Sequence, residues 1–145
     1  MELQTGGAKV SRVFRTTDRG STWRVSETPV PAAKPSMGLF SIAFLDASRG
    51  FTAGGDYREV HLASLNGART EDGGRTWHPA PVAPTGFFSA VQAVPGRPSE
   101  LLAVGLAGSA RSLDGGRTWT PFGKEPLNVA AFADGRTEVP YGFLV

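Results

Sequence analysis

The residues best suited to chemistry are gathered in one short stretch of the chain. Asp56, Tyr57, Arg58 and Glu59 are consecutive, and His61 follows two positions later. A pair of Asp and Glu carboxylates does the acid and base work of glycosidases, and one group of these enzymes uses a Tyr as nucleophile. The same side chains could instead bind a ligand, because loops on rigid scaffolds often carry function. We predict a polar loop, with ligand binding as its alternative role, and we assign no catalytic residue.

Three further aspartates recur at the same place in three copies of one phrase, Ser/Thr-x-Asp-x-Gly-x-Thr-Trp. The defined positions are Thr16, Asp18, Gly20, Thr22 and Trp23; Thr70, Asp72, Gly74, Thr76 and Trp77; and Ser112, Asp114, Gly116, Thr118 and Trp119. Identical aspartates on three successive repeats cannot share one active site. A calcium ion takes about six to eight oxygens, and each copy offers one carboxylate. We therefore predict a structural role for all three.

The phrase has the composition of a tight turn between two strands. The Asp can accept hydrogen bonds from the N–H groups of its own turn, and the Gly supplies a positive φ without steric cost. The Ser and Thr hydroxyls stand near the strand ends, where they can satisfy backbone groups. The Trp is expected to be a wedge between neighbouring sheets, with its indole N–H on a partner.

The spacing of the phrase predicts the strands around it. Its aspartates lie 54 and then 42 positions apart, an interval that suits one four-stranded unit of roughly 40–50 residues. Two strands should precede each of the last two copies, and helical periodicity is absent. The expected strands are 39–44 and 50–55 before the second copy, and 88–94 and 101–105 before the third.

The phrase resembles the Asp-box, or bacterial neuraminidase repeat, at every defined position. The resemblance implies an all-β fold, a β-propeller of four-stranded antiparallel blades. The stretch from Phe40 to Tyr57 is most similar to the bacterial relatives of photosystem II assembly factors, and sialidases are more distant. The expected division is a half-blade at 1–25, full blades at 26–80 and 81–122, and a half-blade at 123–145.

This division is short for a closed propeller, which usually has about four to eight blades. The chain could be a fragment of a longer propeller, and the unusual ending at 138–145 favours that. It could instead close by self-association, with two copies making six blades. A homodimer is therefore one expected partner state.

Composition excludes several classes of function. There is no cysteine, and the net charge is +2 with arginines spread along the chain. We expect no thiol chemistry, no nucleic-acid partner and no membrane span. His61 and His78 lack metal-ligand spacing, so no metal and no cofactor is predicted. Residues 1–7 do not read as a signal peptide, although relatives are often exported, so the compartment stays unassigned.

The sequence favours a non-catalytic binding or assembly scaffold whose ligand is a protein or a carbohydrate. The alternative is a fragment of a glycoside hydrolase or sialidase-like enzyme. Sialidases usually carry a Phe/Tyr-Arg-Ile-Pro motif. The most similar segment of this chain, Val13-Phe14-Arg15-Thr16, lacks the Ile-Pro, so the motif is absent. Fold resemblance alone does not decide between the two.

Overall fold

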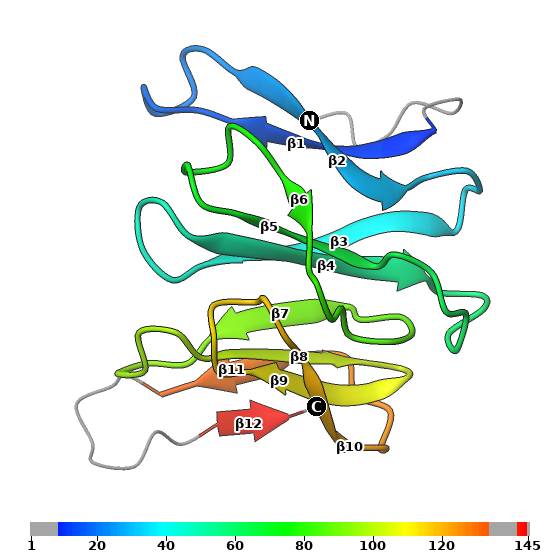
Figure 1. Cartoon of the computed structure of the whole chain (residues 1–145). Coiled ribbons are helices and arrows are strands. Elements are labelled where there is room, and N and C mark those ends of the chain that lie inside the picture. The colour runs from blue at the N-terminus through cyan, green and yellow to red at the C-terminus, as the bar shows by residue number, and fades with distance from the viewer. Residues whose placement is uncertain (1–8, 134–141, 145) are drawn as a thin grey trace.

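The computed structural model describes residues 9–133 and 142–144, and in these residues every regular element is a β-strand (Figure 1). The strands are β1 Val10–Arg15, β2 Arg24–Pro31, β3 Met37–Phe44, β4 Gly50–Asp56, β5 Gly67–Thr70, β6 His78–Pro79, β7 Ala90–Ala93, β8 Leu101–Gly105, β9 Gly108–Ser112, β10 Thr120–Gly123, β11 Ala130–Phe132 and β12 Gly142–Leu144. Parts of the first and last expected half-blades, at 1–8, 134–141 and 145, lie outside the described residues.

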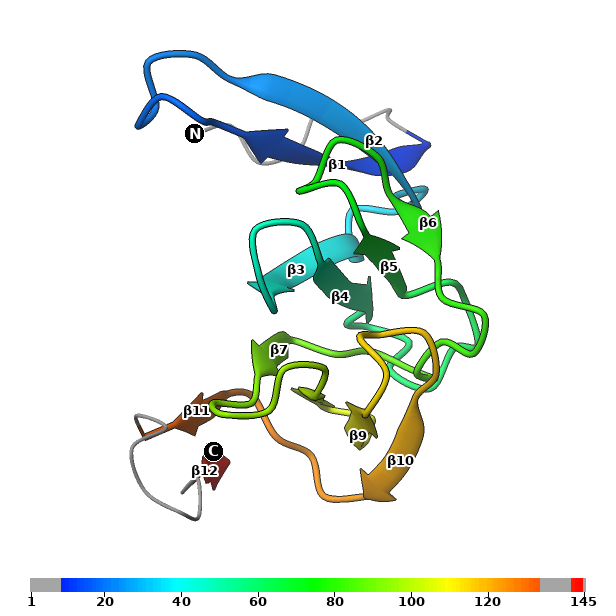
Figure 2. The same ribbon diagram turned by 60° about the vertical axis from the view of Figure 1, so that its left-hand side comes forward.

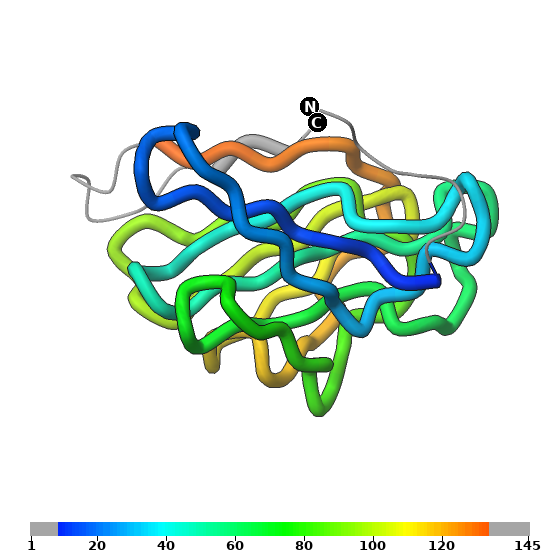
Figure 3. The backbone as a smooth tube through the Cα atoms, turned by 90° about the horizontal axis from the view of Figure 1, so that it is seen from above, coloured from blue at the N-terminus to red at the C-terminus, as the bar shows by residue number. Residues whose placement is uncertain are grey.

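The strands form four antiparallel sheets that follow one another along the chain. Two sheets have four strands, in the orders β3-β4-β5-β6 and β7-β8-β9-β10, and two are pairs, β1-β2 and β11-β12. The sheets are stacked face to face in chain order (Figure 1), and seen along the stack their strands lie over one another (Figure 3). The first strands β3, β7 and β11 lie on one side of the stack, and β6 and β10 lie on the other (Figure 2).

Apolar side chains fill the space between successive sheets. Phe51, Val91 and Leu101 are fully buried between the two four-stranded sheets. Separate clusters join the β1–β2 pair to the first of these sheets and β11 to the second. Burying a side chain of this size contributes roughly 1.5–3 kcal/mol, so the contacts between sheets hold the stack together.

The central strands β4 and β8 are buried along their whole length and contain mostly small or apolar residues. A Cβ added to Gly54 would meet the backbone of Gly38, and one added to Gly105 would meet that of Phe87. Only glycine therefore allows β3 in one sheet, and the segment just before β7 in the other, to approach the second strand so closely.

The expected strands 39–44 and 88–94 are observed as β3 and β7 with slightly different bounds, and two other strands cross an expected blade boundary. β2 continues to Pro31, past the boundary placed after residue 25, because Thr28 and Val30 are buried and extend its pairing with β1 as far as Val10. β10 likewise continues to Gly123, opposite Ser109. The sequence could not reveal these extensions, since the phrase marks where an outgoing strand begins and not where it ends.

Candidate functional site

The polar stretch 56–61 begins at the last residue of β4, on the side of the stack opposite the repeated turns. In Figure 1 the loops β1–β2, β5–β6 and β9–β10 lie at the left, and the β4–β5 loop lies at the right. The segment that joins β2 to β3 contains Lys34 and Ser36 and approaches the same loop, since the Tyr57 N–H donates to the Ser36 carbonyl at 3.2 Å. The candidate binding site is therefore built from two connections of one sheet.

Asp56 is a buried anchor of this loop. Its side chain is 1% exposed, accepts the Arg58 N–H at 2.9 Å, and lies 3.5 Å from the Lys34 ammonium. Burial acts to raise the pKa of Asp56, but hydrogen bonds from Arg58, Ser36 and Glu59 outweigh it and lower the pKa. A carboxylate held ionised by its own loop is not a proton donor, so the geometry suits a structural role for Asp56.

Glu59 is exposed and is held by the same lysine. The Lys34 ammonium lies 2.7 Å from the Glu59 carboxylate, and this contact is the main cause that raises the pKa of Lys34. Lys34 thus contacts both Asp56 and Glu59, the two carboxylates that a glycosidase would use as its catalytic pair. His61 is exposed on the same loop, and no hydrogen bond joins it to the others within the described part of the chain.

Tyr57 belongs to an aromatic cluster that reaches the surface. Its ring meets Phe40 edge-on at 6.1 Å and Phe87 at 6.5 Å, and the Arg58 guanidinium lies 6.0 Å from its centroid. Phe87 is buried, whereas Phe40 and Tyr57 are 46% and 42% exposed. The structure therefore presents two aromatic side chains beside one arginine, and Phe40 comes from a different strand.

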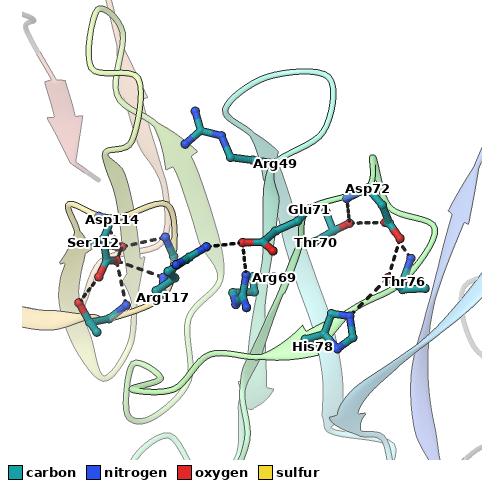
Figure 4. A network of polar contacts seen from close by, with 12 residues as sticks. Arg49, Arg69, Thr70, Glu71, Asp72, Thr76, His78, Ser112, Asp114 and Arg117 are labelled. Carbon is teal, nitrogen blue, oxygen red and sulfur yellow. Dashed lines mark hydrogen bonds and ion pairs between the residues drawn. The ribbon is translucent and has the colours of Figure 1, made fainter.

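The repeated phrase forms three turns built on a common set of hydrogen bonds: turn 1 is 16–23, turn 2 is 70–77 and turn 3 is 112–119. In each turn the Asp accepts from the N–H and the hydroxyl of the Thr four positions later. The hydroxyl distance is 2.6 Å in all three, and the N–H distance is 2.8 or 2.9 Å. The leading Thr or Ser accepts the N–H of the turn's Gly at 2.8–2.9 Å. Figure 4 shows the contacts of Asp72 with Thr70 and Thr76, and that of Asp114 with Ser112.

The indole N–H of Trp23 and of Trp119 donates to the Gly carbonyl of its turn. The expected partner is wrong for Trp77, whose buried indole N–H has no acceptor within the described residues.

These hydrogen bonds keep the three aspartates ionised. The Thr22 hydroxyl is the largest cause that lowers the pKa of Asp18, and the Thr76 hydroxyl does the same to the pKa of Asp72. At Asp114 desolvation opposes the shift, and hydrogen bonds from Thr118 and Ser112 still lower the pKa. Each carboxylate is thus occupied by its own turn, which makes it a poor acid for catalysis.

The tryptophans of the three turns differ in burial. Trp77 is 6% exposed and Trp119 is 5% exposed, and each packs between its own sheet and the one before it. Trp23 is 57% exposed, so the expected wedge is wrong for this position in the described residues. The cause is plain: no described sheet lies on that face of the β1–β2 pair.

An ion bridge joins turn 2 to turn 3. Glu71 lies 2.6 Å from the Arg69 guanidinium and 2.7 Å from that of Arg117 (Figure 4). Both arginines lower the pKa of Glu71, and the hydrogen bond from Arg117 is the largest single cause. The bridge borders a shallow cavity of about 180 Å³ that also touches Arg49 and Asp114. Its charged side chains already pair with one another or with their own turns, so this cavity is the weaker candidate for a binding site.

Sequence reasoning found the loop but missed its partners. Lys34, Phe40 and Phe87 are far from 56–61 in sequence, and no local pattern marks them.

Within residues 9–133 and 142–144 no three His, Asp or Glu side chains could share a metal ion. The His78 Nε2 atom lies 3.4 Å from the Thr76 hydroxyl, next to turn 2 (Figure 4). His61 belongs to a different loop, the one between β4 and β5. The described residues also contain no helix with the length and apolar character needed to cross a membrane.

Comparison with known proteins identifies the fold. None of the family models compared with the chain matches it, and no curated protein does. The chain is similar to the crystal structure of an ancestral GH74 enzyme, at 15% identity and a TM-score of 0.54, over 82% of this chain and 16% of that one. It is also similar to YCF48 bound to D1 peptide, at 17% identity and a TM-score of 0.35, over 63% of this chain and 44% of that one.

The chain therefore spans less than half the length of either structure. At these identities the likeness concerns the fold alone. Together with the stacked four-stranded antiparallel sheets, it confirms the predicted fold class: the chain is all-β and forms part of a β-propeller.

Proposed function

We propose that this propeller is a non-catalytic scaffold that binds a peptide segment of another protein. The observation that carries the proposal is the exposed cluster of Phe40, Tyr57 and Arg58. Aromatic side chains and arginine supply most of the binding energy at protein interfaces. The buried Phe87 and the hydrogen-bonded Asp56 fix the cluster in place, which reduces the entropy lost on binding.

Peptide binding fits this cluster better than sugar binding. A sugar ring stacks on a free aromatic face, but Arg58 lies over the ring of Tyr57 and Phe40 meets it edge-on. An apolar peptide side chain can instead pack on the exposed outer surface that Phe40 and Tyr57 form together. Glu59, Lys34 and Arg58 would then meet polar groups of the peptide at the rim.

The alternative function is that of a glycosidase, because Asp56 and Glu59 could supply the pair of carboxyl groups that such enzymes use. Against it stand the ionised, buried state of Asp56 and the contact of Glu59 with Lys34. Fluorogenic glycosides provide the test. Turnover that disappears in Glu59→Gln would favour the enzyme over the scaffold.

The test of peptide binding is selection from a displayed library of random peptides of about twelve residues. We expect enriched peptides whose affinity falls at least about tenfold for Tyr57→Ala and for Arg58→Ala, as expected for central interface residues. The control is Leu113→Ala, because Leu113 is 60% exposed in turn 3 at the opposite end of the sheets. Peptides that bind all four proteins equally would contradict the proposed site.

A further inference from the structure

Turns 2 and 3 each contain an Asp followed directly by a Gly, a sequence that is prone to rearrange. Asp72 precedes Gly73 and Asp114 precedes Gly115, whereas turn 1 has Arg19 at this position. In an Asp-Gly sequence the Gly nitrogen can attack the Asp side-chain carboxyl. A C–N bond forms, the carboxyl OH and the N–H proton leave as water, and a succinimide ring results. A side chain on the second residue hinders this closure, so turns 2 and 3 are the reactive pair.

Water then opens the succinimide, and the product depends on the carbonyl that it attacks. Attack at the side-chain carbonyl returns Asp, and attack at the main-chain carbonyl leaves isoaspartate, whose backbone runs through Cβ and Cγ and is one carbon longer. In turn 2 the side-chain carboxylate of Asp72 accepts hydrogen bonds from Thr70, Arg75 and Thr76. An isoaspartate carries its free carboxylate on Cα, so the turn cannot reform these bonds.

In the folded chain a neighbouring connection holds the nitrogen that would attack. The Gly73 N–H donates to the Ser48 carbonyl at 2.8 Å, and the Gly115 N–H donates to the Ser99 carbonyl at 2.9 Å. Ser48 lies between β3 and β4, and Ser99 lies between β7 and β8, so both four-stranded sheets use the same arrangement. Each nitrogen must give up this bond before it can turn toward the preceding carboxyl.

The carboxyl group that would be attacked is held as well. The Thr76 hydroxyl lies 2.6 Å from the Asp72 carboxylate, and the Thr118 hydroxyl lies 2.6 Å from that of Asp114. The hydrogen bond from the Thr76 hydroxyl is the largest cause that lowers the pKa of Asp72. Ring closure needs the protonated carboxyl, because its OH leaves as water. A closed turn therefore restrains both reacting groups.

We propose that Asp72 and Asp114 are isoaspartate-forming sites that react when turns 2 and 3 open and stay inert while these turns are closed. Local opening costs less free energy than unfolding of the whole chain, so a turn can open while the sheets persist. Chemical modification of an open state makes unfolding irreversible. The same phrase that builds the turn thus limits the lifetime of the folded chain.

The test is the isoaspartate content of the whole chain after weeks in warm buffer near neutral pH, prepared with heavy-oxygen water. Reopening of the succinimide places the heavy oxygen in the new carboxyl. Trypsin releases the two turns as separate peptides, 70–75 and 112–117, since each is preceded by an Arg and ends in one. Mass spectrometry measures the label, and methylation by an isoaspartate methyltransferase measures the isoaspartate.

We expect both peptides to react at least about tenfold more slowly in buffer than in guanidinium chloride, because the reaction needs an open turn. The turn 1 peptide, 16–19, is the control and should gain the least label in both solvents. Equal rates for turns 2 and 3 in the two solvents, or a faster reaction in turn 1, would overturn the proposal.

Thr76→Val and Thr118→Val separate the opening of one turn from unfolding of the whole chain. Each removes the hydroxyl contact of one Asp and nearly keeps the size of the side chain. We expect Thr76→Val to speed the reaction of Asp72 several-fold and to leave turn 3 unchanged, and Thr118→Val to do the reverse. Circular dichroism checks the strands. Faster reaction of both turns, or of neither, in a variant with intact strands would overturn the proposal, and if a variant lost its strands the comparison of solvents would still decide.

Discussion

Turn 1 and turn 3 share the Asp, Gly, Thr and Trp of the phrase but lie in opposite surroundings. In both turns the Thr hydroxyl lies 2.6 Å from the Asp carboxylate, and in both the indole N–H donates to the carbonyl of the turn's Gly, at 3.1 Å and 3.2 Å. Trp23 is nevertheless 57% exposed and Trp119 is 5% exposed. The phrase thus determines the local turn, while the neighbouring sheet determines whether its Trp contributes to the core.

The turns also differ at the residue after the Asp. This residue has a positive φ in each turn: Arg19 at 57°, Gly73 at 73° and Gly115 at 74°. An L-residue adopts this conformation at a cost of about 1–2 kcal/mol, which glycine avoids. Turn 1 therefore carries backbone strain that turns 2 and 3 do not.

The largest expected effect concerns the tryptophans. Trp119→Ala should lower the free energy of unfolding by about 3–5 kcal/mol, because it leaves a cavity beside Phe51, whose ring centroid lies 4.7 Å away. Trp77→Ala should cost a similar amount. Trp23→Ala should cost less than about 1 kcal/mol in the monomer. Urea unfolding of dilute protein measures the free energy of unfolding of all three variants. Equal losses for Trp23→Ala and Trp119→Ala would contradict the difference in burial between turn 1 and turn 3.

The same contrast should appear inside the first strands of the sheets. Val91→Ala should destabilise the monomer by about 2 kcal/mol, the transfer energy of the lost methyl groups plus a cavity term. Ile42→Ala removes more atoms but should cost less, because Ile42 is 46% exposed. The midpoint of chemical unfolding decides the order, and a larger loss for Ile42 would mean that its face is covered in the monomer.

Removing the carboxylate of turn 2 should have a moderate effect. Asp72→Ala leaves the N–H groups of Arg75 and Thr76 without their acceptor. The expected cost is about 1–2 kcal/mol, the lower part of the range for unsatisfied groups, because water reaches this turn. Thermal unfolding is the measurement, and Glu71→Gln, beside the turn, is the matched control that keeps these bonds. An unchanged melting temperature in Asp72→Ala would contradict the structural role.

Exchanging the residues after the aspartates should have effects of opposite sign. Arg19→Gly should stabilise the chain by about 0.5–1 kcal/mol, since the relief of strain exceeds the added flexibility of the unfolded chain. Gly115→Ala should destabilise it by about 1 kcal/mol. Urea unfolding curves of the two variants and the wild type, recorded at one pH, measure both changes in the free energy of unfolding. Effects of the same sign would show that the strain in turn 1 is absent.

Acid should weaken all three turns together. The pKa values of Asp18, Asp72 and Asp114 are lowered in the folded chain, and that of Asp46, which accepts from Ser48 and Arg49, is about 2. A carboxyl group whose pKa is lower in the folded chain stabilises the fold at a pH above its pKa in the unfolded chain, which is near 3.9. This stabilisation is lost as the pH falls toward the folded-state pKa. Stability should be flat above about pH 5 and decline between about pH 4 and pH 2. A melting temperature that holds down to pH 2 would contradict this.

The fold was predictable because its signals are local and repeated. Three copies of one phrase, with two strand patterns before the second and the third, were sufficient to place most strands, and the propeller was implied by the resemblance of the phrase to the Asp-box. The reach of β2 to Pro31 was not visible, because it depends on the pairing of Val10 with Pro31 across the sheet. The exposure of Trp23 was equally hidden, since its sequence is that of a buried wedge.

The candidate site was only half predictable. Asp56 to His61 stood out as a run of polar residues, but the loop alone could not show that Asp56 is buried while Tyr57 is exposed. That division depends on Lys34, Ser36 and Phe40, which the fold brings from the neighbouring connection and strand. The sequence therefore located the loop, and the distinction between anchor and contact surface required the structure.

The most direct test of the central claim is the solvent access of single tryptophans. In Trp77→Phe/Trp119→Phe only Trp23 remains, and in Trp23→Phe/Trp77→Phe only Trp119 remains, because the chain has three tryptophans. Acrylamide quenching at submicromolar protein should be several-fold stronger for Trp23 than for Trp119. Equal quenching of the two would contradict the claim that the neighbouring sheet, and not the turn itself, buries the tryptophan.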